Sequence, residues 1–196
     1  MLEKMSDAQF ELDDLEGAEA NLVMAVEKMD AKGILDSQEG ARLLQKLGDL
    51  QTELNGVEEA LTSYRSARQI LFDRGLLQGV SAACLLANMA TLEADSLPLE
   101  ALRSFEDAKK LFLEADALDS EEYADLLMNL GVQHLKAGQV DLALEHLEDA
   151  KEVFKSKGLL DSMVGAKLWT NLGSALLQRG SSRHSSPALL QVMTPP

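Results

Sequence analysis

Apolar residues recur along the chain at the three- and four-residue spacings of amphipathic helices, and the whole pattern repeats about every 42 residues. Between Ser37 and Leu54 the apolar side chains fall on one helical face, and a second such face starts at Val57 after a break at Asn55-Gly56. No stretch alternates apolar and polar residues as a half-buried strand would. The pattern predicts an all-α chain built from pairs of helices.

Two interleaved patterns mark equivalent positions in each copy of the repeat. In the second helix of a pair, an alanine is followed by a larger apolar residue and then by another alanine. These positions are Ala18, Leu22, Ala25; Ala60, Tyr64, Ala67; Ala101, Phe105, Ala108; and Ala143, Leu147, Ala150. The first helices carry, in phase, Leu47-Gly48, Met89-Ala90, Leu130-Gly131 and Leu172-Gly173. Because one pair cannot bury both of its faces, we expect neighbouring pairs to stack.

Local signals indicate where the helices begin and end. Gly33, Gly75, Asp116 and Gly158 follow the second helices at equivalent positions, and these residue types favour a helix end. Asp36-Ser37-Gln38-Glu39 and Asp119-Ser120-Glu121-Glu122 are typical helix starts, and Pro98 suits a first helical turn. We expect four helix pairs, over 1–36, 37–78, 79–119 and 120–161, and a ninth helix over 162–179. Gly180 is expected to end the ninth helix, before a disordered Ser- and Pro-containing tail over 181–196.

Glycine in the middle of a helix costs roughly 1 kcal/mol relative to alanine, yet Gly48, Gly131 and Gly173 stand there. The expected compensation is a close approach by the backbone of the paired second helix. Ala60, Ala101 and Ala143 are the residues predicted at that contact.

The segment from Trp169 to Leu176, WTNLGSAL, resembles the W-x₂-L-G-x₂-Y opening of the tetratricopeptide repeat (TPR), with leucine in the tyrosine place. The alanine pattern of the second helices matches the A-x₃-F/Y-x₂-A core of that repeat. The long repeat is similar to the 42-residue subclass found in kinesin light chains and Pins-type adaptors. The resemblance over residues 1–180 implies a right-handed α-solenoid of about four and a half repeats, with first helices lining a concave, peptide-binding surface.

Composition narrows the possible partners and location. The chain has 33 acidic and 18 basic residues, a net charge of −15, so it would repel nucleic-acid phosphates and anionic membranes. No apolar run is long enough to span a bilayer, and the N-terminus does not resemble a secretory signal. Cys84 is the only cysteine, which excludes an intrachain disulfide. We predict a cytoplasmic protein that binds other proteins rather than nucleic acid or membranes.

Residues capable of catalysis or metal binding are scattered along the sequence. His134, His146 and His184 stand apart from Cys84 without metal-ligand spacing, and motifs for phosphate binding or nucleophilic catalysis are missing. We predict no enzyme activity, no cofactor and no metal site. His134 takes the semi-buried tyrosine position of the repeat, His146 is expected to be solvated, and Cys84 is expected to fill a small apolar space.

A row of polar residues stands one position before the paired leucine or methionine of each first helix. The row reads Lys46, Asn88, Asn129 and Asn171. The resemblance implies that such asparagines clamp the backbone of an extended ligand, because an amide is both donor and acceptor. With Arg42 and Lys167 at groove phases, the predicted peptide-binding groove is Arg42, Lys46, Asn88, Asn129, Lys167 and Asn171. The alternative is that the amides bond a neighbouring helix. Asp49 and Asp125 share the surface, which leaves the ligand's charge open.

We therefore predict a scaffold or adaptor that binds an extended or helical peptide segment of another protein. The alternative is a structural subunit that self-associates through residues 162–179, where Trp169, Leu172 and Leu176 stand beside few charges. Besides a second copy, the tail segment Pro187–Leu190 or a tenth helix of a longer array could cover this surface.

Overall fold

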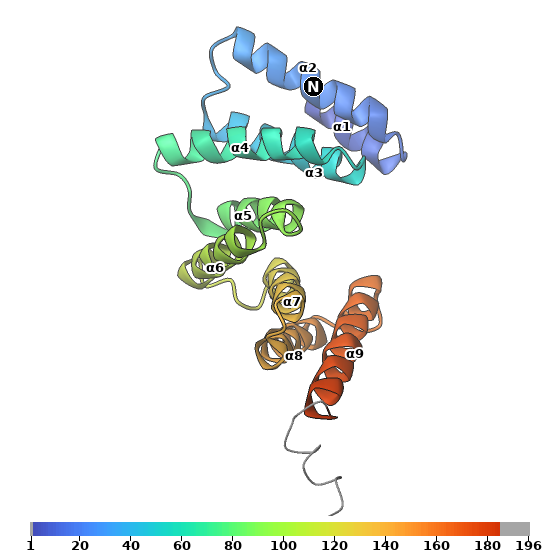
Figure 1. Ribbon diagram of the computed structural model, residues 1–196. Helices are drawn as coiled ribbons and strands as arrows, with labels where there is room; N and C mark the ends of the chain where they lie inside the picture. The colour runs from blue at the N-terminus through green and yellow to red at the C-terminus, as the bar shows by residue number, and fades with distance from the viewer. Residues whose placement is uncertain (1, 185–196) are drawn as a thin grey trace, which may run out of the picture. The chain divides into compact units, whose positions relative to one another are not determined.

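The computed structural model describes residues 2–184, which form nine α-helices and no strand (Figure 1). The helices are α1 (Leu2–Glu11), α2 (Leu15–Ala31), α3 (Gln38–Glu53), α4 (Val57–Asp73), α5 (Gly79–Glu93), α6 (Pro98–Glu114), α7 (Glu121–Lys136), α8 (Val140–Ser156) and α9 (Met163–His184). They divide into two compact units, α1 to α6 up to Ala115 and α7 to α9 from Asp116 onward. The predicted all-α class is confirmed.

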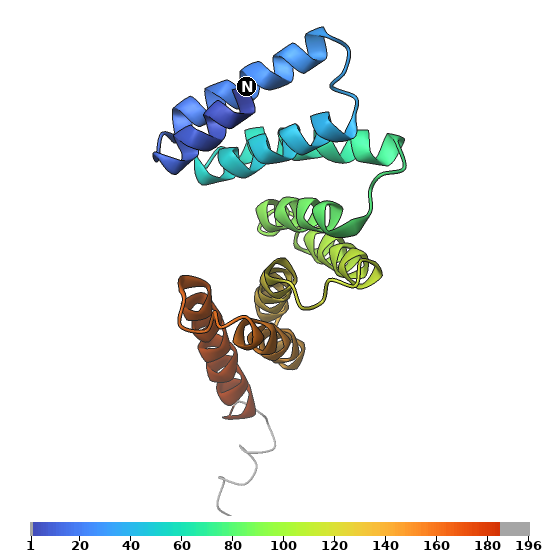
Figure 2. The same ribbon diagram turned by 180° about the vertical axis from the view of Figure 1, so that it is seen from behind.

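Consecutive helices form hairpins within each unit. In the first unit α1 packs on α2, α3 on α4, and α5 on α6, and the pairs contact one another through α2 with α3 and α4 with α5. In the second unit α7 packs on α8, and α9 packs mainly on α8 and to a lesser extent on α7. Figures 1 and 2 are views from opposite sides, and both show the two helices of each pair side by side. No helix in this described part of the chain is both long and apolar enough to cross a bilayer.

Side-chain caps and turn-forming residues mark several helix boundaries, as the sequence predicted. Ser37 accepts a hydrogen bond from the backbone N–H of Gly40 (3.0 Å), and Ser120 accepts one from that of Tyr123 (3.1 Å). Pro98 lies in the first turn of α6. Asp116 takes a left-handed backbone conformation with φ of 52°, at the position where the other repeats have a glycine. Aspartate tolerates this conformation better than most residues, which explains the exception.

The repeated alanines form the centre of the core. Ala18, Ala60, Ala101 and Ala143 are completely buried, as are Ala67, Ala108 and Ala150. The larger residues between them, Leu22, Tyr64, Phe105 and Leu147, are buried too. Ala25 of α2 is only partly buried, because its partner α1 has just 10 residues and is shorter than the 15 to 17 residues of α2 to α8. Small residues in these positions let the paired helices lie close together.

The mid-helix glycines differ from expectation in what they contact. A Cβ atom on Gly48 would lie 2.6 Å from ring carbons of Tyr64, and one on Gly131 would lie 2.7 Å from Cγ of Leu147. The close approach is therefore made mainly by the large side chain of the second helix. At Gly131 the predicted backbone contact is present as well, because the carbonyl oxygen of Ala143 would lie 3.3 Å from the added Cβ atom.

The ninth helix is longer than predicted. It continues through Gly180 to His184, so the expected end at residue 179 is wrong. A glycine disfavours a helix by about 1 kcal/mol but does not terminate one unless it adopts the left-handed conformation, and Gly180 does not. The rest of the predicted disordered tail, from residue 185, lies outside the described residues.

Candidate functional site

The two predicted groove cations of the first unit are paired with acidic residues of α1. Arg42 and Lys46 lie one turn apart on α3. Arg42 Nη1 is 2.7 Å from Oε1 of Glu3, and Lys46 Nζ is 2.8 Å from the same oxygen. Arg42 also pairs with Glu39 (2.6 Å) and Lys46 with Asp7 (3.1 Å). Three carboxylates thus surround two cations, and α1 supplies two of the three.

Hydrogen bonds from Arg42 and Lys46 lower the pKa of Glu3 to about 2, against a smaller opposing effect of burial. Glu3 therefore stays charged at every physiological pH. An acidic ligand that approached Arg42 or Lys46 would have to displace a carboxylate of α1. In the first unit these cations consequently attract an anion less than the sequence alone indicates.

Asn88 bonds the neighbouring first helix, as the alternative interpretation proposed. Its Nδ2 donates to Oδ1 of Asp49 on α3 at 2.9 Å, and the hydroxyl of Tyr64 donates to the same oxygen at 2.7 Å. Desolvation raises the pKa of Asp49, while the two hydrogen bonds act in the opposite direction. Sequence reasoning assigned Tyr64 to the core and missed that its hydroxyl reaches the polar row.

Three polar contacts join successive first helices at one constant spacing. Glu3 with Arg42, Asp7 with Lys46, and Asp49 with Asn88 are each 39 residues apart. The repeat is about 42 residues long. The second residue of each contact therefore lies about one helical turn before the position that is equivalent to the first residue. Opposite charges at this spacing were the signal in the sequence that could have revealed the first two contacts.

In the second unit the predicted groove residues lie on α7 and α9. Asn129 and Asn171 are partly buried and Lys167 is exposed. Asp125, one turn before Asn129, has its pKa raised to about 6 by desolvation and by Glu121 and Glu122, while Lys167 acts in the opposite direction. The unit therefore places amides, a cation and an easily protonated carboxylate on neighbouring first helices.

The two histidines of the second unit are both buried and stack on each other. His134 and His146 are 6 and 7 % exposed, and their ring centroids are 5.2 Å apart. Nδ1 of His134 shares a hydrogen bond with Oε1 of Gln139 (2.7 Å). The prediction that His146 is solvated is wrong, because it precedes the core residue Leu147 on the side of α8 that packs against the rest of the unit. Cys84 is half-buried.

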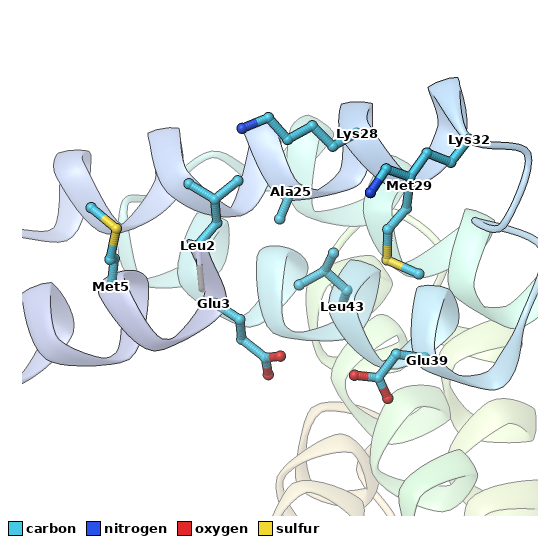
Figure 3. A pocket seen from close by; sticks show the side chains of 9 residues that line it. All are labelled: Leu2, Glu3, Met5, Ala25, Lys28, Met29, Lys32, Glu39 and Leu43. Atoms are coloured by element: carbon cyan, nitrogen blue, oxygen red, sulfur yellow. The ribbon is translucent and has the colours of Figure 1, made fainter.

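A pocket of about 520 Å³ opens between α1, α2 and α3 (Figure 3). Its apolar lining consists of Leu2, Met5, Ala25, Met29 and Leu43. Lys28 and Lys32 lie along its α2 edge, and Glu3 and Glu39 lie along the opposite edge. The pocket is adjacent to the Arg42 ion pairs and is large enough for one or two apolar side chains of a partner.

Comparison with known proteins identifies the fold. No family model and no curated protein sequence matches this chain. Among solved structures, BtubC (BKLC) from P. vanneervenii superposes with a TM-score of 0.75 at 19 % identity, covering 100 % of this chain and 81 % of BtubC. TPR-like repeats of a putative kinesin light chain from Podosopora anserina superpose with a TM-score of 0.74 at 14 % identity, covering 97 and 91 % of the two chains.

A third similar structure is the Rap conjugation gene regulator of the plasmid pLS20, solved in complex with the Phr* peptide. It superposes with a TM-score of 0.66 at 20 % identity, covering 87 % of this chain but only 46 % of the regulator. Together with the nine helices and the repeated core positions, these similarities show that the chain has a TPR-type fold, an all-α repeat solenoid. The 42-residue subclass stays a prediction from the repeat length.

Proposed function

We propose that the chain is a non-enzymatic scaffold that binds a peptide segment of a partner protein along its first helices. The observation that carries the proposal is the polar row Lys46, Asn88, Asn129 and Asn171. These side chains are partly buried at one repeated position, whereas the neighbouring leucines, Leu47, Leu130 and Leu172, are in the core. The Rap regulator, which shares the fold and was solved with a peptide, supports the class of ligand.

Amide side chains suit the recognition of a peptide backbone. The hydrogen bond from Asn88 to Asp49 uses its amide nitrogen, so its carbonyl oxygen can accept from a ligand N–H. In the second unit, Asn129 and Asn171 extend the row on α7 and α9. The cations of α3 are paired with α1, so we propose that an extended or helical segment is held by its main chain more than by its charge.

The test uses peptides selected from a random display library against the intact chain. Asn129→Ala combined with Asn171→Ala should weaken a selected peptide by about 0.5–1.5 kcal/mol per lost hydrogen bond, measured by calorimetry, without lowering the melting temperature. Gln69→Ala removes an exposed amide from α4 and serves as the matched control. Unchanged affinity in the double variant would contradict the proposal.

The second candidate function is a structural subunit that self-associates through α9. Trp169 is 49 % exposed and Leu177 is 76 % exposed, which favours a contact there. The two functions predict different oligomeric states, since the scaffold is expected to stay monomeric without its partner and the self-associating subunit is not. The cytoplasmic location stays a prediction.

A further inference from the structure

One side of α9 leaves large apolar residues uncovered. Trp169, Leu176 and Leu177 are 49, 48 and 76 % exposed. Their spacing of seven and one residues places them on a single helical face with Gly173 between them. We call this set, Trp169, Gly173, Leu176 and Leu177, the open face of α9.

The equivalent face of the other first helices is covered by their paired second helix. Leu44 of α3 and Leu127 of α7 stand in the place of Trp169 and are 6 and 1 % exposed. The residues equivalent to Leu176 are Gln51 in α3 and His134 in α7, and both are also buried. Within residues 2–184, the open face therefore has the position of a helix-pairing surface without a helix that pairs with it.

The glycine of the open face shows the same difference. Tyr64 fills the space beside Gly48, and Leu147 fills the space beside Gly131. A Cβ atom built on Gly173 would have no contact within 4 Å among the described residues, apart from its two chain neighbours and the nearby backbone of α9. A large apolar side chain from another helix can therefore occupy this space.

Charge indicates which kind of helix fits. Between residues 163 and 181, α9 contains Lys167 and Arg179 and no acidic residue. Each of the second helices α2, α4, α6 and α8 has more acidic than basic residues. In α8 the acidic residues are Asp141, Glu145, Glu148, Asp149 and Glu152, against Lys151 and Lys155. An acidic helix would thus find in α9 the least acidic partner in the described chain.

We propose that α9 binds an acidic amphipathic helix supplied by a partner protein, and that this helix completes the last pair. Its large apolar residue would sit over Gly173, between two alanines, as Leu147 sits over Gly131 between Ala143 and Ala150. One edge of the site is shared with α8, since Lys151 Nζ lies 6.0 Å from the ring centroid of Trp169. Asn171 is two residues from Gly173 and so lies on a different side of α9. The open face and the proposed peptide groove therefore use different sides of α9, and Lys167 lies on the groove side.

The chain supplies its own probe for the experiment. A synthetic peptide of residues 138–158 reproduces α8, which already pairs with a first helix of the same design. It contains no tryptophan, so the fluorescence of Trp169, the only tryptophan of the chain, reports binding to the intact protein. We expect a saturable change that weakens as salt is raised, because opposite charges are brought together.

Gly173→Leu fills the open space from within and should weaken the peptide at least tenfold. Ser174→Leu makes a similar change at an exposed residue on the side of α9 equivalent to Asp49, and should leave binding unchanged. A peptide in which Leu147 is replaced by Asp should not bind. Circular dichroism checks that both protein variants remain folded.

Three results would overturn the proposal. The first is no saturable change with the wild-type chain, and the second is equal binding by the Gly173→Leu variant or by the Leu147→Asp peptide. The third is sedimentation showing a dimer of the wild type that Gly173→Leu abolishes, without peptide binding, which would assign the open face to a second copy. Failure of the asparagine variants in the groove test would leave all of these readouts unchanged.

Discussion

A single repeat position has opposite physical roles in different helices. Gly131 is necessary because Leu147 and the backbone of α8 occupy the space where a Cβ would stand, whereas Gly173 has open space there. The sequence shows the same residue at both positions. Only the presence or absence of a neighbouring helix decides what the glycine does.

Alanine substitutions at these two glycines should therefore change stability in opposite directions. Gly131→Ala should destabilise the second unit by about 1–2 kcal/mol, since overpacking outweighs the gain in helix propensity. Gly173→Ala should stabilise it by about 0.5–1 kcal/mol, because it gains propensity without a clash. Urea unfolding followed by Trp169 fluorescence measures both. The same sign for both variants would contradict the assignment.

Asp125 should make the second unit less stable as the pH rises toward neutrality. Its pKa of about 6 in the folded state lies above the ordinary value of 3.8. A raised pKa means that the folded state holds the proton more tightly, so stability is fully present below pH 4 and is lost as the pH rises through 6. Asp125→Asn should stabilise the unit by about 1–2 kcal/mol at pH 7, after allowance for solvent screening.

The measurement is the difference in unfolding free energy between wild type and Asp125→Asn at several pH values. This difference should grow from pH 4 to pH 7, which separates the effect of Asp125 from that of the other carboxylates. A difference that is constant over this range would show that Asp125 titrates normally in the folded chain.

Among the elements, α1 depends most on side-chain charge for its position. It is the shortest helix described, and its acidic residues Glu3 and Asp7 hold it against Arg42 and Lys46 of α3. The lowered pKa of Glu3 means that this contribution is present above pH 4.5 and is lost as the pH falls toward 2. Helices α2 to α8 depend instead on buried alanines and large apolar residues.

Removing the charge of Glu3 should loosen α1 without unfolding the rest of the first unit. We expect Glu3→Gln to speed amide hydrogen exchange over residues 2–11 by about fivefold, the equivalent of about 1 kcal/mol for partly exposed ion pairs. Glu11→Gln changes an exposed glutamate at the end of the same helix and should have no such effect. Equal exchange in both variants would contradict the role of the ion pairs.

Across the whole molecule, charge is distributed unevenly. The chain carries a net charge of −15, yet α9 carries no acidic residue and leaves an apolar face exposed. In each helix pair the first and the second helix both carry more acidic than basic residues, whereas α9 carries more basic than acidic residues. The two compact units each contain such pairs, and within residues 2–184 the second unit also contains α9, a first helix whose apolar face is exposed.

The sequence by itself determined the helices, their pairing and the alanine core, because these follow from local periodicity repeated four times. It also determined the helix starts at Ser37 and Ser120, where a hydroxyl caps the chain locally. The partners of the polar row were decided only by the tertiary structure. Whether Asn88 meets Asp49, or Arg42 meets Glu3, depends on how one hairpin is offset against the next. Opposite charges 39 residues apart indicate two of these contacts, but the offset itself is set by packing between hairpins, which no local pattern encodes.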